Sequence, residues 1–204
     1  MFEIRIHGRG GQGVVTAAEL LSVAAFDEGR YAQAFPSFGS ERTGAPVVSF
    51  CRIDSRPIRA HDPILDPHAV IIIDPTLLHQ VDVFSGLSAE GFVLINTARS
   101  LGELGLEALG GRLHPSRIQT VPATRLAREL LGRPLPNAAV LGGFAALSGV
   151  VSLTAVTAAV RARFAGNIGE SNAAAAERAF ASVRARLGSA TPALAAGPQE
   201  PVGA

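Results

Sequence analysis

The sequence of 204 residues contains one cysteine, no tryptophan and no lysine, so all 18 of its basic residues are arginine. A lone cysteine rules out a disulfide within the chain. Iron–sulfur clusters and structural zinc sites need several thiolates at fixed spacing, so we expect this chain to hold no such centre itself. Cys51 lies in the alternating stretch PVVSFCRI and is expected to be a buried, unreactive thiol.

Charge excess and long apolar runs are also missing. The formal net charge is only +1, while hydrophobic residues make up 48% of the chain. These values fit neither a basic nucleic-acid binder nor a disordered chain. No apolar stretch approaches the roughly 20 residues that cross a bilayer, and the opening MFEIRIHG follows a strand pattern instead of that of a basic leader. We therefore expect a cytoplasmic protein with no membrane and no nucleic acid among its partners.

The apolar pattern predicts an α/β fold. A strand over residues 2–6 precedes a helix over 14–26, in which Val14, Ala17, Ala18 and Leu21 share one face. Mainly apolar runs at 69–73, 92–96 and 117–121 predict strands of a parallel sheet that is buried on both faces.

Other segments complete this expected organisation. Residues 47–53 and 56–59 are typical of a hairpin that turns at Asp54-Ser55, and 76–83 of a short helix. Further helices are predicted over 124–131, 138–150, 153–164 and 172–187.

The predicted architecture is a Rossmann-like, mostly parallel sheet flanked by helices, with a helical C-terminal part. Residues 1–187 are expected to form a single domain. Residues 188–204 have few large apolar side chains and several prolines, so a disordered tail is expected there.

A glycine-rich loop joins the first strand to the first helix. Its glycines follow the spacing G-x-G-x-x-G, which lets backbone approach a ligand closely and exposes helix N-terminal amides to an anion. The candidate binding residues are Gly8, Arg9, Gly10, Gly11, Gln12 and Gly13. Arg42, in the second glycine-containing loop GSERTGAP, is a further candidate for contact with an anionic ligand.

The glycine loop alone leaves alternatives open. A nicotinamide dinucleotide site usually has an acidic residue after the next strand, but the segment AQAFPSFGS contains none before Glu41. The glycines could also serve only close packing of helix against sheet, or contact with a neighbouring chain.

No catalytic or metal-ligating residue is assigned from sequence. The chain has no H-E-x-x-H, Ser/His/Asp or paired-carboxylate pattern. Four histidines are expected to be surface or capping residues: His61, His68, His79 and His114. Only His7, at the end of the first predicted strand beside the glycine loop, has a position of interest.

Four longer motifs carry a family resemblance: HGRGGQGVVTAAELL, AFPSFGSERTGAPVVSFCRID, VIIIDPTLL and NAAVLGGFAALSGVV. In this order, and over residues 1 to about 187, the chain resembles the gamma subunit of the 2-oxoacid:ferredoxin oxidoreductases, which include pyruvate synthase and ketoisovalerate oxidoreductase.

This resemblance implies a multisubunit enzyme that decarboxylates a 2-oxoacid oxidatively, transfers the acyl group to coenzyme A and passes electrons to ferredoxin or to an NAD-linked flavoprotein. It implies alpha, beta and delta type partner subunits, which would carry thiamine diphosphate, magnesium and the iron–sulfur clusters. The present chain would bind no cofactor tightly, and coenzyme A would be a substrate of the complex.

Three hypotheses follow. The chain is a gamma subunit that helps admit or hold coenzyme A through its glycine loop, or an independent nicotinamide-binding dehydrogenase domain, or a purely structural subunit. On the first and third hypotheses the isolated chain has no activity.

Overall fold

Strand β1 (Phe2–Arg9) lies inside a six-stranded sheet with the strand order β2-β3-β1-β4-β5-β6. The computed structural model describes residues 1–37 and 44–189. The other strands are β2 (Tyr31–Pro36), β3 (Pro46–Asp54), β4 (Ala69–Ile72), β5 (Phe92–Asn96) and β6 (Ile118–Val121). Strands β1, β4, β5 and β6 are parallel, whereas β3 is antiparallel to both of its neighbours. The predicted α/β fold with a mostly parallel sheet is confirmed.

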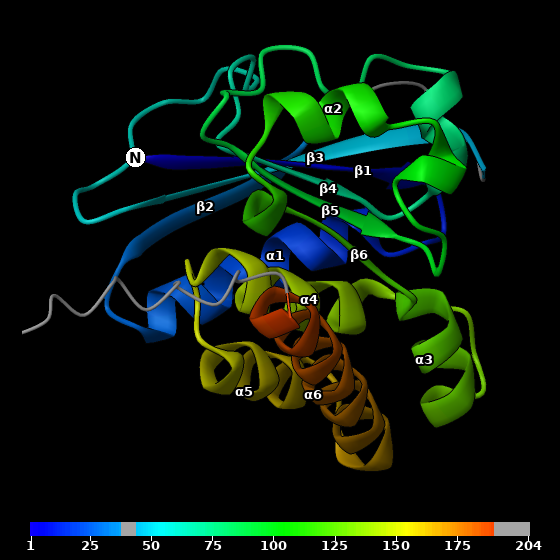
Figure 1. The fold of residues 1–204 in the computed structure, drawn as a ribbon. Helices are drawn as coiled ribbons and strands as arrows, with labels where there is room; N and C mark the ends of the chain where they lie inside the picture. The colour runs from blue at the N-terminus through cyan, green and yellow to red at the C-terminus, as the bar shows by residue number, and fades with distance from the viewer. Residues whose placement is uncertain (38–43, 190–204) are drawn as a thin grey trace, which may run out of the picture.

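Helices cover both faces of this sheet (Figure 1). The larger helices are α1 (Val14–Asp27), α3 (Ala123–Leu131), α4 (Asn137–Ser148), α5 (Leu153–Arg163) and α6 (Gly166–Ser189). Helices α1, α4, α5 and α6 lie on one side, and the short α2 (Glu107–Arg112) lies on the other. Three 3-10 helices accompany them: η1 (Pro75–His79), η2 (Gly102–Leu104) and η3 (Pro115–Arg117). The predicted helical C-terminal part is thus present.

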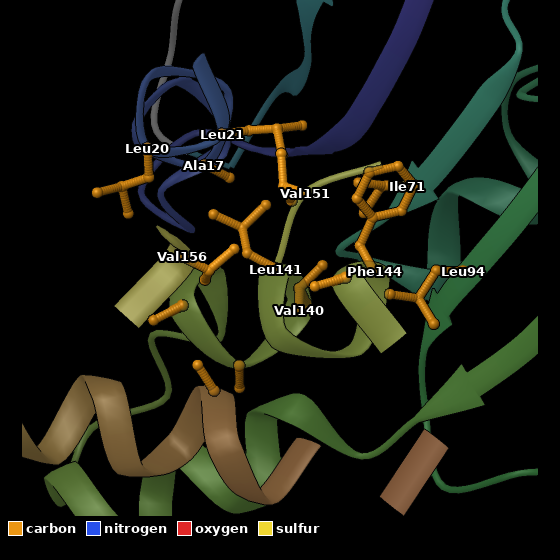
Figure 2. Packing of buried hydrophobic residues seen from close by; sticks show 14 of the residues in the cluster. Ala17, Leu20, Leu21, Ile71, Leu94, Val140, Leu141, Phe144, Val151 and Val156 are labelled. Atoms are coloured by element: carbon orange, nitrogen blue, oxygen red, sulfur yellow. The ribbon is translucent and has the colours of Figure 1, made fainter. Parts of the chain in front are cut away.

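Strand β4 shows how the apolar runs build two cores. Ala69 and Ile71 belong to the larger core beneath α1 and α4, whereas Val70 and Ile72 belong to the smaller core on the opposite face. Because successive residues of a strand point to opposite faces, a strand buried on both sides must be apolar throughout. Figure 2 shows the larger core, where Phe144 of α4 lies close to Ile71.

The predicted hairpin at Asp54-Ser55 is wrong. Strand β3 pairs with β2 on one edge and with β1 on the other, so neither edge is free for a strand after residue 54. Residues 55–68 instead cross the sheet without regular structure, held by two buried arginines. Arg52 donates to the carbonyl oxygen of Asp62 at 2.7 Å, and Arg5 donates to that of Leu65 at 3.2 Å.

The helix predicted over residues 76–83 is shorter than expected. It is the single 3-10 segment η1, which begins when Asp74 accepts a hydrogen bond from the backbone N–H of Thr76. In contrast, α6 begins at Gly166, six residues before the predicted start.

Three further observations bear on the expectations. Cys51 is buried, and burial raises the pKa of its thiol to about 12, as expected of an unreactive cysteine. Between residues 1–37 and 44–189, no helix has the length and apolarity needed to cross a membrane. The expected tail falls almost entirely on residues 190–204, which lie outside the described part of the chain.

Candidate functional site: a cleft beside the glycine loop

The glycine loop turns the chain from β1 into α1. Gly11 and Gly13 have φ angles of 91° and 77°, a left-handed conformation that glycine adopts without strain. Gly10 donates its N–H to the carbonyl of Ala45 at 3.0 Å, and its own carbonyl accepts from the N–H of Gly44 at 3.3 Å. These two bonds fix the loop against the chain entering β3.

Helix α1 begins without a side-chain cap. Its N-cap residue is Gly13, which has no side chain to accept hydrogen bonds from the first turn. The first amides of a helix have no partner within the helix, and they carry the positive end of its dipole. The loop therefore presents N–H donors at its end.

A cleft of about 960 Å³ opens at this point. Its walls come from the glycine loop, the start of α1, the end of α3 with the following connector, and the start of α6. The lining residues are Arg9, Gly10, Gly11, Gly13, Val14, Val15, Thr16, Val47, Leu130, Leu131, Arg133, Leu135, Asn137, Phe164, Asn167, Ile168, Ser171 and Asn172.

The cleft has the electrostatic character of an anion site. Residues from the first turns of three helices, α1, α4 and α6, contribute to its lining, and the N-terminal end of a helix carries the positive end of its dipole. The described lining residues include two arginines and no carboxylate. Apolar side chains such as Leu131, Phe164 and Ile168 form the rest of the wall and can contact an uncharged group of the ligand.

Two buried amides add uncharged polar groups. Asn137, the first residue of α4, is 5% exposed, and its Oδ1 accepts from the N–H of Ala138 at 2.9 Å. Asn172 is 4% exposed, and its Nδ2 donates to the carbonyl of Ile168 at 2.8 Å. Neither the Nδ2 of Asn137 nor the Oδ1 of Asn172 has a partner among the described residues. Neither atom is among the fully buried side-chain atoms that lack a partner, so both are open to the cleft, where water or a ligand can contact them.

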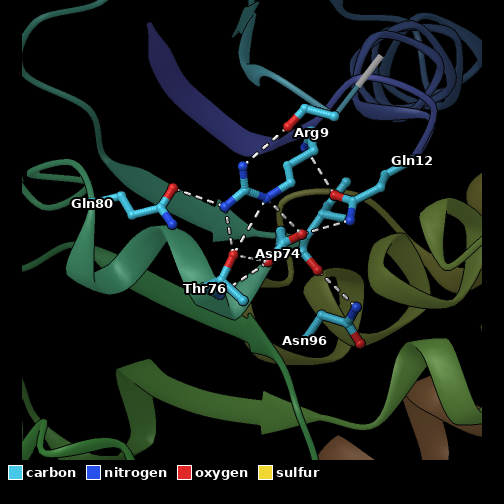
Figure 3. A network of polar contacts seen from close by, with 8 residues as sticks. Arg9, Gln12, Asp74, Thr76, Gln80 and Asn96 are labelled. Carbon is cyan, nitrogen blue, oxygen red and sulfur yellow. Dashed lines mark hydrogen bonds and ion pairs between the residues drawn. The ribbon is translucent and has the colours of Figure 1, made fainter.

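Arg9 is held by its own chain (Figure 3). Its guanidinium donates to Thr76 Oγ1 at 2.7 Å, to Gln80 Oε1 at 2.8 Å and to the carbonyl of Gly44 at 3.0 Å. Its Nε also lies 3.2 Å from Asp74 Oδ2. The charge of Arg9 is thus directed to the end of β4, and its role in this structure is to fix the loop.

Asp74 is the centre of this network. Its Oδ2 accepts from Gln12 Nε2 at 2.7 Å, while its Oδ1 accepts from Thr76 Oγ1 at 2.6 Å. Burial acts to raise the pKa of Asp74, but the hydrogen bonds from Thr76 and Gln12 and the charge of Arg9 outweigh it, so the pKa lies below its ordinary value. The carboxylate therefore stays ionised and holds Arg9 and Gln12.

Asp74 also bears on the dinucleotide alternative. It follows β4, the parallel neighbour of β1, where a nicotinamide site would have the acidic residue that binds the ribose hydroxyls. From the sequence, this acidic residue was expected after β2, the next strand along the chain, but β2 lies two places away from β1 in the sheet. Both carboxylate oxygens of Asp74 are already engaged, so the structure does not favour this alternative.

The predicted binding residues thus divide into groups. Gly10, Gly11 and Gly13 line the cleft, as does Arg9, although its guanidinium is occupied. Gln12 turns away, because its Oε1 accepts from the N–H of Arg9 at 2.8 Å. Gly8 has a packing role: a Cβ there would lie 2.5 Å from Cγ2 of Val14. Arg42 lies outside the described residues.

Sequence reasoning missed the lining residues of the far wall, including Arg133, Asn137 and Asn172. Asn137 is the first residue of the motif NAAVLGGFAALSGVV, which carries part of the family resemblance, but no role was predicted for this side chain. Arg133 and Asn172 had no local signal, because only the tertiary fold brings their helices to the glycine loop.

His7 is a buried neighbour of the site. It is 6% exposed, and neither ring nitrogen has a hydrogen-bond partner among the described residues. Burial lowers the pKa of His7 from 6.5 to about 4, and the charge of Arg5 acts in the same direction. His7 is neutral at pH 7.

Metal-ligand geometry is not found in the part of the chain that the structure describes. No group of three or more His, Cys, Asp or Glu side chains there could hold a metal ion. With its one thiol buried, the described chain does not fit an iron–sulfur cluster.

A mostly parallel sheet with helices on both faces, and with a cleft at the first strand–helix turn, places this chain among the α/β proteins. Residues 3–182 match the family of pyruvate ferredoxin/flavodoxin oxidoreductases, and the chain belongs to this family. This confirms the resemblance carried by the four sequence motifs.

Known relatives are similar over nearly their whole length. The gamma subunit common to the pyruvate and ketoisovalerate oxidoreductases of Thermococcus kodakarensis is 51% identical, with 88% of this chain and 96% of that one covered. Pyruvate synthase subunit PorC of Methanothermobacter marburgensis is 47% identical over the same shares of the two chains. The crystal structure of pyruvate oxidoreductase subunit PORC from Thermotoga maritima is 34% identical, with a TM-score of 0.74, and the match covers 88% of this chain and 95% of that one.

Proposed function

We propose that this chain is the gamma subunit of a thiamine diphosphate-dependent 2-oxoacid oxidoreductase and that its cleft holds the phosphate-bearing part of coenzyme A. The complex would convert a 2-oxoacid to carbon dioxide and an acyl-CoA, with two electrons passed to ferredoxin or another acceptor. Alpha, beta and delta type subunits would complete it, and its location would be cytoplasmic. Thiamine diphosphate supplies the carbon chemistry from those partners.

The observation that carries the proposal is the composition of the cleft. A diphosphate is a delocalised anion that backbone N–H groups and helix N-termini bind well. Here residues from the first turns of three helices line one cavity, beside a loop in which a Cβ added to Gly11 would have no atom within 4 Å. The apolar wall suits the uncharged parts of a nucleotide. The chain's own work would be to bind and orient coenzyme A, and its residues would take no part in breaking the carbon–carbon bond.

A pair of matched glycine substitutions tests the binding role. Gly11 and Gly29 both have positive φ angles, 91° and 79°, and both have no atom within 4 Å of an added Cβ. Gly11→Asp and Gly29→Asp therefore introduce the same charge at similar backbone cost, but only the first places it in the cleft. In the assembled complex, Gly11→Asp should raise the KM for coenzyme A at least about tenfold by like-charge repulsion, while Gly29→Asp should change it little.

Two results would contradict the proposal. An unchanged KM for coenzyme A in the Gly11→Asp complex would leave packing or subunit contact as the role of the glycines. Oxidation of any 2-oxoacid by the isolated chain would contradict the assignment of the carbon chemistry to partner subunits. A titration of the isolated chain with NADH serves as a control, because saturable binding would revive the dehydrogenase alternative.

A further inference from the structure

Arg133 lines the cleft with a guanidinium group that is free to bind a ligand. Of the two arginines that line it, Arg9 is committed to Thr76, Gln80 and Asp74. Arg133 is exposed, and no described residue pairs with its side chain. It lies on the wall formed by the α3–α4 connector, while Gly11 and Gly13 lie on the wall formed by the glycine loop.

The backbone around Arg133 is restrained. Gly132 ends α3 with φ of 68°, and its N–H donates to the carbonyl of Arg128 at 3.0 Å. Pro134 and Pro136 follow, each with a fixed φ. A side chain anchored in such a connector loses little backbone freedom when it binds a ligand, so its contact contributes more to affinity.

The two walls offer different chemistry to two different anions. Helix N-termini with backbone amides suit a diphosphate, whose charge is spread over several oxygens. A guanidinium suits a phosphomonoester, which carries close to two negative charges at neutral pH and accepts paired N–H bonds. Coenzyme A carries both groups, because a 3′-phosphate stands on the ribose next to its diphosphate. ADP, NAD and dephospho-coenzyme A carry the diphosphate alone.

We infer that Arg133 binds the 3′-phosphate of coenzyme A and so makes the cleft selective for coenzyme A over nucleotides without that group. The inference rests on the proposed function, since it assigns one more residue to the same ligand. Arg133 is a specificity residue in this assignment, and the glycine loop binds the diphosphate common to all of these nucleotides.

Calorimetric titration of the full chain with coenzyme A and with dephospho-coenzyme A tests the inference. The wild-type chain should bind coenzyme A about tenfold more tightly, as expected for one charge-assisted pair at a partly open site. Arg133→Gln should weaken coenzyme A binding to about the level of dephospho-coenzyme A and leave dephospho-coenzyme A binding unchanged. Arg133→Lys should recover part of the preference, and the preference should shrink as salt is added.

Arg128→Gln is the matched control. Arg128 is also exposed and lies near the end of α3, but it does not line the cleft, so this variant removes the same charge without removing the contact. Its preference for coenzyme A should equal that of the wild type. In the assembled complex, the ratio of the KM for dephospho-coenzyme A to the KM for coenzyme A should fall with Arg133→Gln and stay unchanged with Arg128→Gln.

The outcomes separate the two claims. The role of Arg133 would be overturned if Arg133→Gln weakened the binding of both nucleotides equally, or if the wild-type chain bound them with the same affinity. The proposed coenzyme A site would stand in either case. No binding of either nucleotide to the wild-type chain or complex would overturn the proposed function and this inference together.

Discussion

Asn137 lies directly against Gly13. A Cβ built on Gly13 would come within 2.8 Å of Nδ2 of Asn137, well inside van der Waals contact. Gly13 is the N-cap of α1 and Asn137 is the first residue of α4, so two helix starts meet at this contact. The absence of a side chain at Gly13 is what lets α4 bring a buried amide to the glycine loop.

The contact predicts different outcomes for two neighbouring glycines. Gly13→Ala adds a methyl group at a φ of 77° and drives it into Asn137, so we expect a loss of about 2 to 3 kcal/mol in the free energy of unfolding. Gly11→Ala has a similar φ but open space, and it should cost only about 1 kcal/mol. Urea denaturation of both variants measures the difference. Equal losses would mean that the Asn137 contact contributes nothing, and a double variant with Asn137→Ala should recover part of the Gly13→Ala loss.

Asp74→Asn tests the network that fixes the loop. The amide keeps the size of the carboxylate but places a donor toward Gln12 Nε2, which donates to Asp74 in the wild type, or toward Arg9, which forms an ion pair with it. We expect a loss of about 1 to 3 kcal/mol in the free energy of unfolding, together with weaker binding in the cleft. Asp27→Asn is a control, because Asp27 is exposed and forms no side-chain bond among the described residues; it should change stability by less than about 0.5 kcal/mol. A stable Asp74→Asn variant would show that Arg9 and Gln12 hold the loop without the charge.

Some parts of this fold follow from local patterns alone. The run Ala69–Ile73 is apolar at every position because β4 is covered on both faces, and this pattern identified the strand correctly. Helix α1 was placed within one residue because Gly13 ends the loop and the apolar positions repeat with helical spacing.

Other parts depend on contacts that no local pattern records. The prediction of a hairpin at Asp54-Ser55 was wrong because β1 occupies the edge of β3 that a third strand would need. The predicted start of α6 at residue 172 excluded Gly169, which lies inside the helix because the packing there leaves no room for a Cβ: one would lie 2.1 Å from the carbonyl oxygen of Phe164.

The candidate site divides in the same way. The glycines that line the cleft were visible as a motif, since their spacing reflects the local turn. Arg9 belongs to the same motif and was predicted to bind a ligand, but its engagement with Thr76 and Gln80 depends on a segment more than sixty residues away. Arg133 could be found only once α3 was seen to end at the cleft.

Removal of residues 190–204 is expected to leave the complex able to assemble. This segment has few large apolar side chains and several prolines, so it has little surface to bury against a partner. The truncated chain should copurify with its partner subunits in the same ratio as the full chain and retain its KM for coenzyme A. Loss of the partners on truncation would show that the segment takes part in docking.

The last prediction concerns the pH dependence that His7 confers. His7 shares one face of β1 with Arg5 and Arg9, and its register partners are Val48 on β3 and Ile72 on β4. With its pKa lowered from 6.5 to about 4, the folded state disfavours the proton, while the unfolded chain accepts it near 6.5. The stability that neutral His7 confers is therefore fully present above about pH 6.5 and is lost as the pH falls toward 4.

The size of this effect follows from the shift. The two pKa values differ by about 2.5 units, which corresponds to roughly 3.5 kcal/mol at most, because each unit is about 1.4 kcal/mol. Urea denaturation of the wild type and of His7→Leu between pH 7.5 and pH 4.5 separates this contribution from the carboxylates, which titrate in both proteins. The wild type should lose about 1 to 3 kcal/mol more than the variant over this range. Parallel curves for the two proteins would mean that the buried imidazole accepts its proton in the folded state at an ordinary pKa, with a hydrogen-bond partner that the ring lacks here.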